Sequence, residues 1–562
     1  MENVTAAEDF TNRNDEKSDV FVKTVKTSLS KSSLVRDQDK RSVKDAYDIY
    51  RAPASDRRSV QIIRPFSASS KNSYSAPVTL PIGPAYLAAV LENANYNVSI
   101  LDSVGEDIYQ ITRSECGFYN VQGLSKAQII ARIDPDAAVV GLSLMFSQEW
   151  LLHRDLIKEI RKNYPELAIV VGGEHATSLP EYVLRDCPEI DFVITGEGEL
   201  TFLNLVHNLF HDKPTNNVVG CSFLDDDGTY VSTDLSQRIE VIDELPRPAW
   251  HLCPVKNYFI DNWTMGVSKG RNMPILATRG CPYQCTFCSN PGMWTTRYKM
   301  RDVTQVVDEI EFLINEYDAN SIDFFDLTAI VKKKWTLDFC AEIKRRGLKF
   351  IWQLPSGTRS EALDEETLAA IYEAGCEYLV YAPESGSKET LVAIKKKVNL
   401  ESITESIQMA VKAGHIVKVN LIIGFPHERT KHVFETLRYA IQMAFAGAHD
   451  CNIAKFSPYP GSQLFDELRS DGVIPELSDK YFSSLVSQFD LTAKSKFCPN
   501  VPSLVLMLAT TFGHGLFYIL AYLGHPRRIW RVVRLVISRK FSPQNLFEQR
   551  IFDLLMRSKL VK

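Results

Sequence analysis

The chain has 562 residues, a net charge of −5 and the apolar and charged content of an ordinary globular protein. This length is too great for one hydrophobic core and predicts about three domains. The negative charge excludes a general attraction to nucleic acid, and no apolar segment precedes a signal-type cleavage site, so we expect a cytoplasmic protein whose 11 cysteines stay reduced.

Residues 1–57 are rich in Ser, Lys, Asp and Arg and contain few large apolar residues. Such a composition cannot bury enough apolar surface to fold, so it predicts a disordered tail without chemistry. The acidic residues Glu2, Glu8 and Asp9 argue against a transit peptide, which is poor in acids.

Residues 58–235 alternate short apolar runs with helical patterns. The runs lie at 60–63, 98–101, 137–144, 168–173 and 192–195, and the helical patterns lie at 84–93, 149–163 and 181–185. This alternation predicts an α/β domain with a doubly wound, flavodoxin-like parallel sheet. Such sheets bind ligands at the carboxyl ends of their strands.

Small residues follow three of these runs. The segments are Gly141–Ser143, Val171–Thr177 and Thr195–Glu199, and they contain Gly172, Gly173 and Gly196. Glycine allows the backbone to approach a bulky cofactor closely, although for a single glycine a tight strand-to-helix turn is the favoured interpretation. Three such turns at successive strand ends favour a ligand-binding surface.

The order of these features resembles the cobalamin-binding domain that precedes many radical S-adenosylmethionine (SAM) cores. The resemblance implies that Ser143, Gly172, Gly173, Thr177, Gly196 and Glu197 bind cobalamin. The motif D-x-H-x-x-G, whose histidine ligates cobalt, is absent, and His175 lies in a different loop. The resemblance therefore implies cobalamin in a base-off form without a histidine ligand, and a degenerate domain that binds no corrin remains an alternative.

A proline-rich connector, residues 236–272, leads to three cysteines in the spacing C-x-x-x-C-x-x-C: Cys281, Cys285 and Cys288. They directly follow the apolar run 273–278 and the turn residues Arg279 and Gly280. Three thiolates on one loop can hold three irons of a [4Fe–4S] cube and leave the fourth iron open. Structural zinc is the alternative, but it prefers four ligands from two cysteine pairs, and the later cysteines are scattered singly.

The segment CPYQCTFC, with Phe287 before the third cysteine, resembles the cluster loop of the radical SAM superfamily. The resemblance implies that SAM chelates the open iron. It also implies that a reductant such as flavodoxin or ferredoxin supplies the electron that cleaves SAM to methionine and a 5′-deoxyadenosyl radical. That radical abstracts hydrogen from an unactivated carbon.

Residues 273–465 repeat a strand and a helix and predict a partial (β/α)6 TIM-type barrel, with functional residues at the carboxyl ends of its strands. Beyond the first run, strand patterns lie at 321–326, 349–354, 377–383, 417–425 and 451–457, with helical patterns at 303–317, 333–345, 365–374, 400–413 and 431–446. By resemblance, Asp326, Glu384, Ser385 and Gly424 contact SAM. The alternative for each is a cap or a turn residue.

Residues 466–562 predict a helical C-terminal region. Residues 501–523 are almost entirely apolar, and a basic amphipathic helix with Arg527, Arg531 and Arg534 follows. Three interpretations remain open: contact with the inner face of a membrane, helices that cap the substrate cavity, and a membrane span, against which Gly513 and Pro502 argue. The first two, surface contact and a cavity cap, favour a lipid-like or tetrapyrrole-sized substrate.

The whole order resembles the cobalamin-dependent radical SAM enzymes, in the group with the anaerobic magnesium-protoporphyrin IX monomethyl ester cyclase and the hopanoid-modifying enzymes. The resemblance implies C-methylation or oxidative cyclisation of a hydrophobic substrate, and it names no catalytic residue. The alternatives are a radical SAM enzyme that has lost cobalamin, and a non-enzymatic iron–sulfur redox sensor. A tRNA methylthiotransferase would need a second cluster site and a basic end domain, and the sequence has neither.

Overall fold

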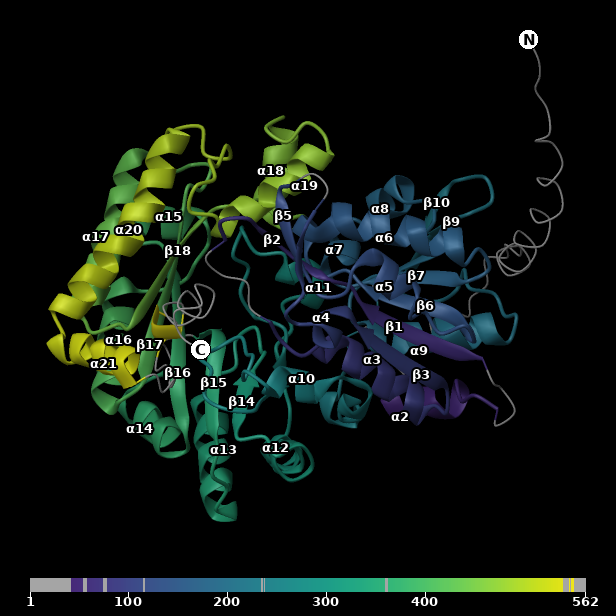
Figure 1. Ribbon diagram of the computed structural model, residues 1–562, viewed down its shortest axis with the longest axis horizontal. Coiled ribbons are helices and arrows are strands. Elements are labelled where there is room, and N and C mark those ends of the chain that lie inside the picture. Colours follow the sequence, from purple (N-terminus) through teal and green to yellow (C-terminus); the bar gives the residue numbers. More distant parts are fainter. Residues whose placement is uncertain are drawn as a thin grey trace, which may run out of the picture.

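The computed structural model describes residues 42–53, 58–73, 78–114, 117–233, 236, 238–358, 362–538, 545 and 547–549. Figure 1 shows two α/β units side by side, the first in purple and blue and the second in teal and green. Buried apolar residues of both units, for example Ile169 and Ile322, belong to one contiguous core cluster. The two units therefore form one packed body.

The first unit is built on a seven-stranded sheet within the described residues. Its parallel strands are β3 (Asn97–Asp102), β1 (Ser59–Arg64), β6 (Ala137–Ser143), β7 (Ala168–Gly172) and β8 (Phe192–Ile194), in that spatial order, and β9 (Cys221–Leu224) and β10 (Tyr230–Ser232) extend it antiparallel. Numbered along the chain, the parallel strands follow the flavodoxin-like order 2-1-3-4-5. The doubly wound sheet expected from the sequence is confirmed.

Helices cover both faces of this sheet. They are α3 (Ile82–Asn93), α5 (Lys126–Ile130), α6 (Trp150–Asn163), α7 (Glu174–Ser178), α8 (Pro180–Asp186) and α9 (Gly198–Phe210), and the short α4 (Ser103–Glu106) follows β3. The apolar face of α9 and that of α3 lie in one core cluster, while α6 contributes to the cluster shared with the second unit. The sheet is thus buried on both faces, as parallel sheets require.

The prediction of a disordered tail over residues 1–57 is wrong for residues 43–49. Residues Val43–Ile49 form helix α2, which Ser42 and Asp45 close with reciprocal side-chain to backbone hydrogen bonds. Ala46 and Tyr47 are buried in the core cluster that contains α9. Three apolar side chains at helical spacing were enough to anchor this segment, and residues 1–41 lie outside the described part.

A second small sheet lies beside the first unit and was not expected from the sequence. Its antiparallel strands are β2 (Ser67–Ser70), β5 (Tyr119–Gln122) and β4 (Ile111–Arg113). Ser73, just after β2, forms an isolated bridge with Asp490 in the C-terminal region. This sheet therefore joins the first unit to the far end of the chain.

The connector is a packed element that contains η4 (Ile242–Glu244), η5 (Trp250–Leu252) and α10 (Val255–Phe259). Tyr258 donates a hydrogen bond of 2.6 Å to Asp102 at the end of β3. Further along, the backbone of Val267 exchanges two hydrogen bonds with the side chain of Gln353, at 2.8 and 2.9 Å. Val267 is fully buried with Tyr378 of the barrel, so the connector fixes one unit against the other.

The second unit is a six-stranded parallel half-barrel. Its strands, in chain and spatial order, are β11 (Asn272–Ile275), β14 (Ser321–Phe324), β15 (Ile351–Thr358), β16 (Cys376–Glu384), β17 (Ile416–Ile423) and β18 (Asp450–Lys455). Its helices are α12 (Val303–Tyr317), α13 (Lys333–Arg346), α14 (Glu365–Glu373), α15 (Lys388–Ala393), α16 (Leu400–Ala413) and α17 (Thr430–Phe445). The expected (β/α)6 partial barrel is confirmed.

The C-terminal region consists of α18 (Gln463–Ser470), α19 (Asp479–Leu485), η7 (Val486–Phe489), α20 (Ser503–Leu523) and α21 (Pro526–Ser538). Figure 1 shows α20 along α17, on the side of the barrel away from the first unit. His514 of α20 accepts a hydrogen bond of 3.1 Å from the backbone of Ile453 in β18. A Cβ at Gly513 would lie 2.7 Å from Leu437 of α17, so glycine allows this close approach.

Gly513 and Gly515 give a matched test of this packing. Alanine favours the helix equally at both positions, but only at Gly513 does its Cβ meet side chains, since nothing lies within 4 Å at Gly515. We expect the free energy of opening of α20, measured by amide hydrogen exchange, to be lower in Gly513→Ala than in Gly515→Ala by about 1–3 kcal/mol. Equal protection of α20 in the two variants would contradict the close approach.

Candidate functional site

The three predicted cluster cysteines lie on one loop between β11 and the short helix α11 (Asn290–Trp294), and a small hairpin, β12 (Thr278–Arg279) with β13 (Lys299–Met300), frames this loop. Cys281, Cys285 and Cys288 are all partly exposed. Gly280 begins the loop with a φ of 84°, and a Cβ there would lie 2.3 Å from the carbonyl oxygen of Arg297. The turn into the loop therefore requires glycine.

The middle of the loop is held by the barrel. The backbone N–H of Thr286 donates to the carbonyl of Ile394 at 3.0 Å, and its carbonyl accepts from Leu464 at 2.8 Å. The ring of Phe287 packs against that of Phe425, with the centroids 5.7 Å apart. Phe287 thus supports the loop, and a direct contact with a cofactor stays a prediction.

The donor set fits a [4Fe–4S] cube. In the described part of the chain, no three His, Cys, Asp or Glu side chains are arranged to hold a single metal ion. A cube makes a different demand, because each thiolate binds a separate iron. Only the thiolate binds iron, so binding of the cluster must displace the protons of these thiols.

Buried carboxylates of the first unit hold the chain just before the first cysteine. Arg279 donates a hydrogen bond of 2.6 Å to Glu199, which lies in the first turn of α9. Glu197 accepts from Arg238 at 2.8 Å and lies 3.9 Å from Arg279. The Arg279 side chain is only 3% exposed and lies over the ring of Tyr86, so these charges are paired almost without water.

A third carboxylate holds the chain just after the last cysteine. Ser289 donates a hydrogen bond to Glu174 in the turn after β7, and burial raises the pKa of Glu174. Gly461, after β18, lies at the same point, because a Cβ there would be 2.5 Å from Ser178 of α7. We call Glu174, Glu197 and Glu199 the carboxylate clamp, since they bracket the cysteine loop from both sides.

The residues predicted to bind cobalamin gather at one edge of the first sheet. Ser143 is in register with Gly172 at the ends of β6 and β7. Gly173 has a φ of 107°, and Thr177 accepts a hydrogen bond of 3.0 Å from the backbone of Gly196. These residues therefore lie together at the carboxyl ends of the strands, where such sheets bind ligands, although Thr177 and Gly196 are buried in this structure.

Glu197 and His175 depart from that surface. The side chain of Glu197 accepts from Arg238 and from the backbone of Ile239, so it serves the junction between the units. His175 is buried, contacts Ser147 at 2.9 Å and packs against Trp150, with ring centroids 5.1 Å apart. Burial lowers its pKa to about 3, so the imidazole is neutral and belongs to the core.

Asp326, predicted to contact SAM, braces the approach to the cluster loop. Its buried carboxylate accepts hydrogen bonds from the hydroxyl of Thr278 and from the backbone of Ala277 at 3.2 Å. Burial raises its pKa to about 6. The side chain is thus committed to positioning the strand that ends at the cysteines.

The other predicted SAM residues lie at the ends of β16 and β17. Glu384 has a φ of 69°, unusual for a residue with a side chain, and pairs with Lys396 at 3.0 Å. The hydroxyl of Ser385 lies 3.0 Å from that of Thr436. Gly424 has a φ of 87° and donates its backbone N–H to Glu428 at 2.6 Å. Strain at Glu384 is the feature that favours a functional role over a turn.

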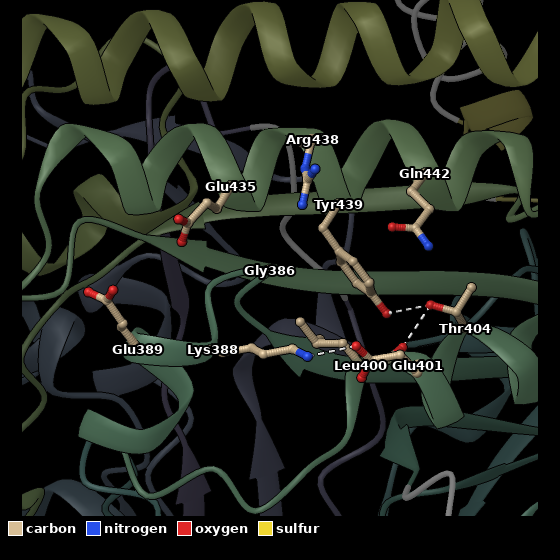
Figure 2. A pocket seen from close by; sticks show the side chains of 10 residues that line it. All are labelled: Gly386, Lys388, Glu389, Leu400, Glu401, Thr404, Glu435, Arg438, Tyr439 and Gln442. Carbon is tan, nitrogen blue, oxygen red and sulfur yellow. Dashed lines mark hydrogen bonds and ion pairs between the residues drawn. The ribbon is translucent and has the colours of Figure 1, made fainter.

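A charged groove of about 330 Å³ lies on the outside of the barrel, between α15, α16 and α17. Figure 2 shows Lys388 pointing toward Glu401, and the two pair at 2.7 Å, while Tyr439 lies 3.3 Å from Thr404. These four side chains form their polar contacts with one another, and all lining residues except Gly386 belong to helices. We assign it no part in the chemistry.

Sequence reasoning overlooked the residues that join the units. Arg279 and Glu199 both stand in segments that the sequence singled out, but their roles depend on a contact across 80 positions of the chain. An arginine beside the cysteines and two acids in a glycine-rich turn were the available signal. It shows charge complementarity, but it does not identify the partners.

Family models match both units. The model of the radical SAM superfamily matches residues 275–440, and that of the B12 binding domain matches residues 74–206. An uncharacterized methyltransferase of Pyrococcus horikoshii is 30% identical over 409 residues, which are 72% of this chain and 82% of that protein. The cytidylyl-2-hydroxyethylphosphonate methyltransferase of Streptomyces wedmorensis is 31% identical, with 71% and 80% covered.

Two further matches concern the enzyme group that the sequence resembles and the fold. The anaerobic magnesium-protoporphyrin IX monomethyl ester cyclase of Rubrivivax gelatinosus is 29% identical over 69% of this chain and 66% of that protein. The structure of the radical SAM methyltransferase TsrM of Kitasatospora setae, with cobalamin and a [4Fe–4S] cluster bound, has a TM-score of 0.58. At 18% identity over 75% of this chain and 79% of that chain, it shows the same fold.

The cysteine loop makes a direct prediction. Cys285→Ala removes one of three thiolates, so we expect reconstituted protein to lose the broad visible absorbance of the cluster and the formation of 5′-deoxyadenosine from SAM. Cys253→Ala, at a partly exposed cysteine outside the loop, is the control and should retain both. Deoxyadenosine formation at the wild-type rate in Cys285→Ala would contradict the cluster assignment.

The carboxylate clamp leads to a second testable prediction. Arg279→Met leaves Glu199 buried without its cation, at a cost of about 3–5 kcal/mol, and should loosen the loop so that reconstituted protein holds less than half the wild-type iron. Arg185→Met breaks the exposed pair with Glu181, worth about 1 kcal/mol or less, and is the control. If both variants bind wild-type amounts of iron and sulfide, the clamp has no role in the cluster site.

Proposed function

The chain belongs to the cobalamin-binding enzymes of the radical SAM superfamily, and from this premise we propose that it methylates an unactivated carbon of a hydrophobic small molecule. Its cofactors are a [4Fe–4S] cluster, SAM and cobalamin, and it is an enzyme of the radical SAM methyltransferase type. The observation that carries the proposal is the meeting of the cysteine loop with the carboxyl edge of the first sheet, through Arg279 and Glu199.

In this proposal residues 58–235 bind cobalamin and residues 273–465 bind the cluster and SAM. Cys281, Cys285 and Cys288 hold the cluster. The sheet edge with Ser143, Gly172, Gly173, Thr177 and Gly196 receives the corrin, base-off and without a histidine ligand. The buried state of His175 supports this last point, because its ring is enclosed by Trp150 and Phe482.

When bound, the cluster and SAM supply a deoxyadenosyl radical, and cobalamin supplies the methyl group to be transferred. The chain itself positions the cysteine loop and the strand ends where SAM would lie. Asp326 and Arg279 fix the two ends of the segment that enters the cysteine loop. Glu384 and Gly424 set the backbone at the ends of β16 and β17, where SAM would lie along the strand ends.

Three observations support methyl transfer to a hydrophobic substrate. Two of the relatives are named as methyltransferases, which supports methyl transfer but not the hydrophobic substrate, because the one whose name gives a substrate acts on a charged phosphonate. Apolar rings lie beside the cysteine loop, since Phe287 packs on Phe425 and Phe425 on Phe456. Leu506 of the apolar helix α20 covers Gly424, because a Cβ there would lie 3.0 Å from its methyl group. The cyclase relative makes oxidative cyclisation the second candidate.

The enzyme needs a reductant and a small-molecule substrate, and we propose that flavodoxin or ferredoxin is the reductant. The proposal also includes a cytoplasmic location with contact between the C-terminal region and the inner face of a membrane. Among the described residues, one helix, Ser503–Leu523, is long and apolar enough to cross a membrane, and its apolar side chains support such contact.

Trideuteromethyl-labelled SAM tests the reaction. Reconstituted protein with cobalamin and dithionite is given a lipid extract of cells that lack the gene, and one apolar compound should gain a trideuteromethyl group. Label confined to the polar fraction would contradict the hydrophobic substrate. A product oxidised without label would contradict methyl transfer and favour the cyclase reaction.

Omission of cobalamin gives a further expectation. Deoxyadenosine formation should persist, since the cluster and SAM suffice for it, while label transfer should fall by about a hundredfold or more, equivalent to about 3 kcal/mol. Both products are quantified by mass spectrometry in the same reaction. Undiminished label transfer by cobalamin-free protein would contradict a role for cobalamin.

A further inference from the structure

Helix α20 has two different faces. The face with Leu506, Ala509, Thr510, His514, Phe517 and Ala521 is buried against the barrel. The opposite face exposes Leu504, Leu508, Phe512, Leu516, Ile519 and Leu523, at spacings of three and four residues. Phe512 is 68% exposed and Leu523 66%. A stripe of six large apolar side chains is more than the scattered apolar residues of an ordinary surface.

The buried face shows that α20 does not span a bilayer in this fold. Tyr518 donates a hydrogen bond to Asp450, and His514 accepts one from the backbone of β18. Both contacts lie in the middle of the helix, at the place where a spanning helix would meet hydrocarbon. Only the exposed stripe is therefore free to meet a membrane, and it can do so from the side.

Helix α21 follows α20 directly and also exposes apolar side chains, together with positive charge. Trp530 is 76% exposed and Ile537 75%, and between and beside them Arg527 and Arg534 are exposed at helical spacing. The remaining arginines serve the fold, since Arg528 donates to the carbonyls of residues 447 and 448. Tryptophan prefers the membrane–water interface, and cations near it are attracted by anionic lipid headgroups.

We propose that the outer face of α20 and α21 docks on a membrane surface that contains anionic lipid. This outer face is the α20 stripe together with Arg527, Trp530, Arg534 and Ile537. Charge selects the occupant, because the arginines are exposed on a chain whose net charge is −5. Phe445, at the end of α17 and 63% exposed, lies 4.0 Å from the Cβ position of Gly524 and widens the apolar surface.

The docked orientation places the cofactor end of the barrel at the membrane. Leu506, in the first turns of α20, contacts Gly424 at the carboxyl end of β17. The outer face begins at the same end of α20, so a docked membrane would lie beside the end of the barrel where SAM is proposed to lie, with α20 between them. This step rests on the proposed hydrophobic substrate, which could then enter from the lipid without crossing water. Docking itself does not depend on the chemistry.

Sedimentation of the full chain with vesicles tests the inference. We expect binding to vesicles of phosphatidylcholine with phosphatidylglycerol to exceed binding to phosphatidylcholine alone by about tenfold or more. The variant with Phe512→Glu and Ile519→Glu should lose this binding, and Arg527→Gln with Arg534→Gln should lose the preference for phosphatidylglycerol. Ile260→Glu, at an exposed apolar residue of the connector, is the control.

Three outcomes would overturn the inference. Wild-type protein that stays in the supernatant with both vesicles has no lipid-binding face. A dimer in solution that Phe512→Glu with Ile519→Glu dissociates would assign the face to a second copy. Binding that appears only in a chain ending at residue 538 would show that residues 539–562 cover the face.

Failure of docking and failure of the proposed function are separable in the same samples. Deoxyadenosine formation from SAM, measured without vesicles, should be unchanged in Phe512→Glu with Ile519→Glu, because these side chains are exposed on the outer face of α20. A variant that neither binds vesicles nor cleaves SAM would contradict the surface role of these residues and show that they maintain the cofactor site.

Discussion

The structure depends on a buried ion pair between its two units. Arg279 stands two residues before the first cysteine and reaches Glu199, across the junction, at 2.6 Å. A buried pair of this kind adds little net stability, since desolvation of the charges offsets their attraction. We infer that its value is specificity, because a docking that separated Arg279 from its carboxylate would leave a buried charge unpaired.

That constraint explains why the sheet edge proposed to receive cobalamin lies against the cysteine loop. The edge with Gly172, Gly173 and Gly196 belongs to the first sheet, and the cysteines belong to the half-barrel, so neither unit contains the complete site. Glu174, beside these glycines, contacts Ser289 beside the last cysteine. The connector adds rigidity through Gln353 and Val267. An enzyme that generates a radical benefits from such fixed geometry, because position and exclusion of water are what the protein contributes.

Much of the fold could be predicted from the sequence, because periodicity and glycine-rich turns are local signals. The half-barrel and the doubly wound sheet follow from them, and the helix over residues 303–317 was placed at its observed bounds. The sheet of β2, β4 and β5 was overlooked because its strands are short and polar. Helix α2 was overlooked because only three apolar side chains anchor it. These side chains pack against α9, which lies far away in the sequence.

The candidate site was predictable in part for the same reason. The cysteine spacing is local, but the partners of Arg279, Glu174 and Glu384 are not, and charge alone does not say which carboxylate an arginine meets. Glu197 shows the difference: sequence suggested a cofactor contact, and its oxygens are held by Arg238 and Ile239. The sequence alone could not decide between membrane contact, a cap over the substrate cavity and a membrane span for the C-terminal region, because only the packing shows which face of α20 is buried.

The central claim is that three thiolates hold an iron–sulfur cube with one iron left open to SAM. The most direct measurement is the electron paramagnetic resonance spectrum of the dithionite-reduced protein before and after addition of SAM. The account predicts a reduced [4Fe–4S] signal whose g-values shift when SAM is added. A cluster signal that SAM leaves unchanged, or protein that contains zinc and no iron or sulfide, would contradict it.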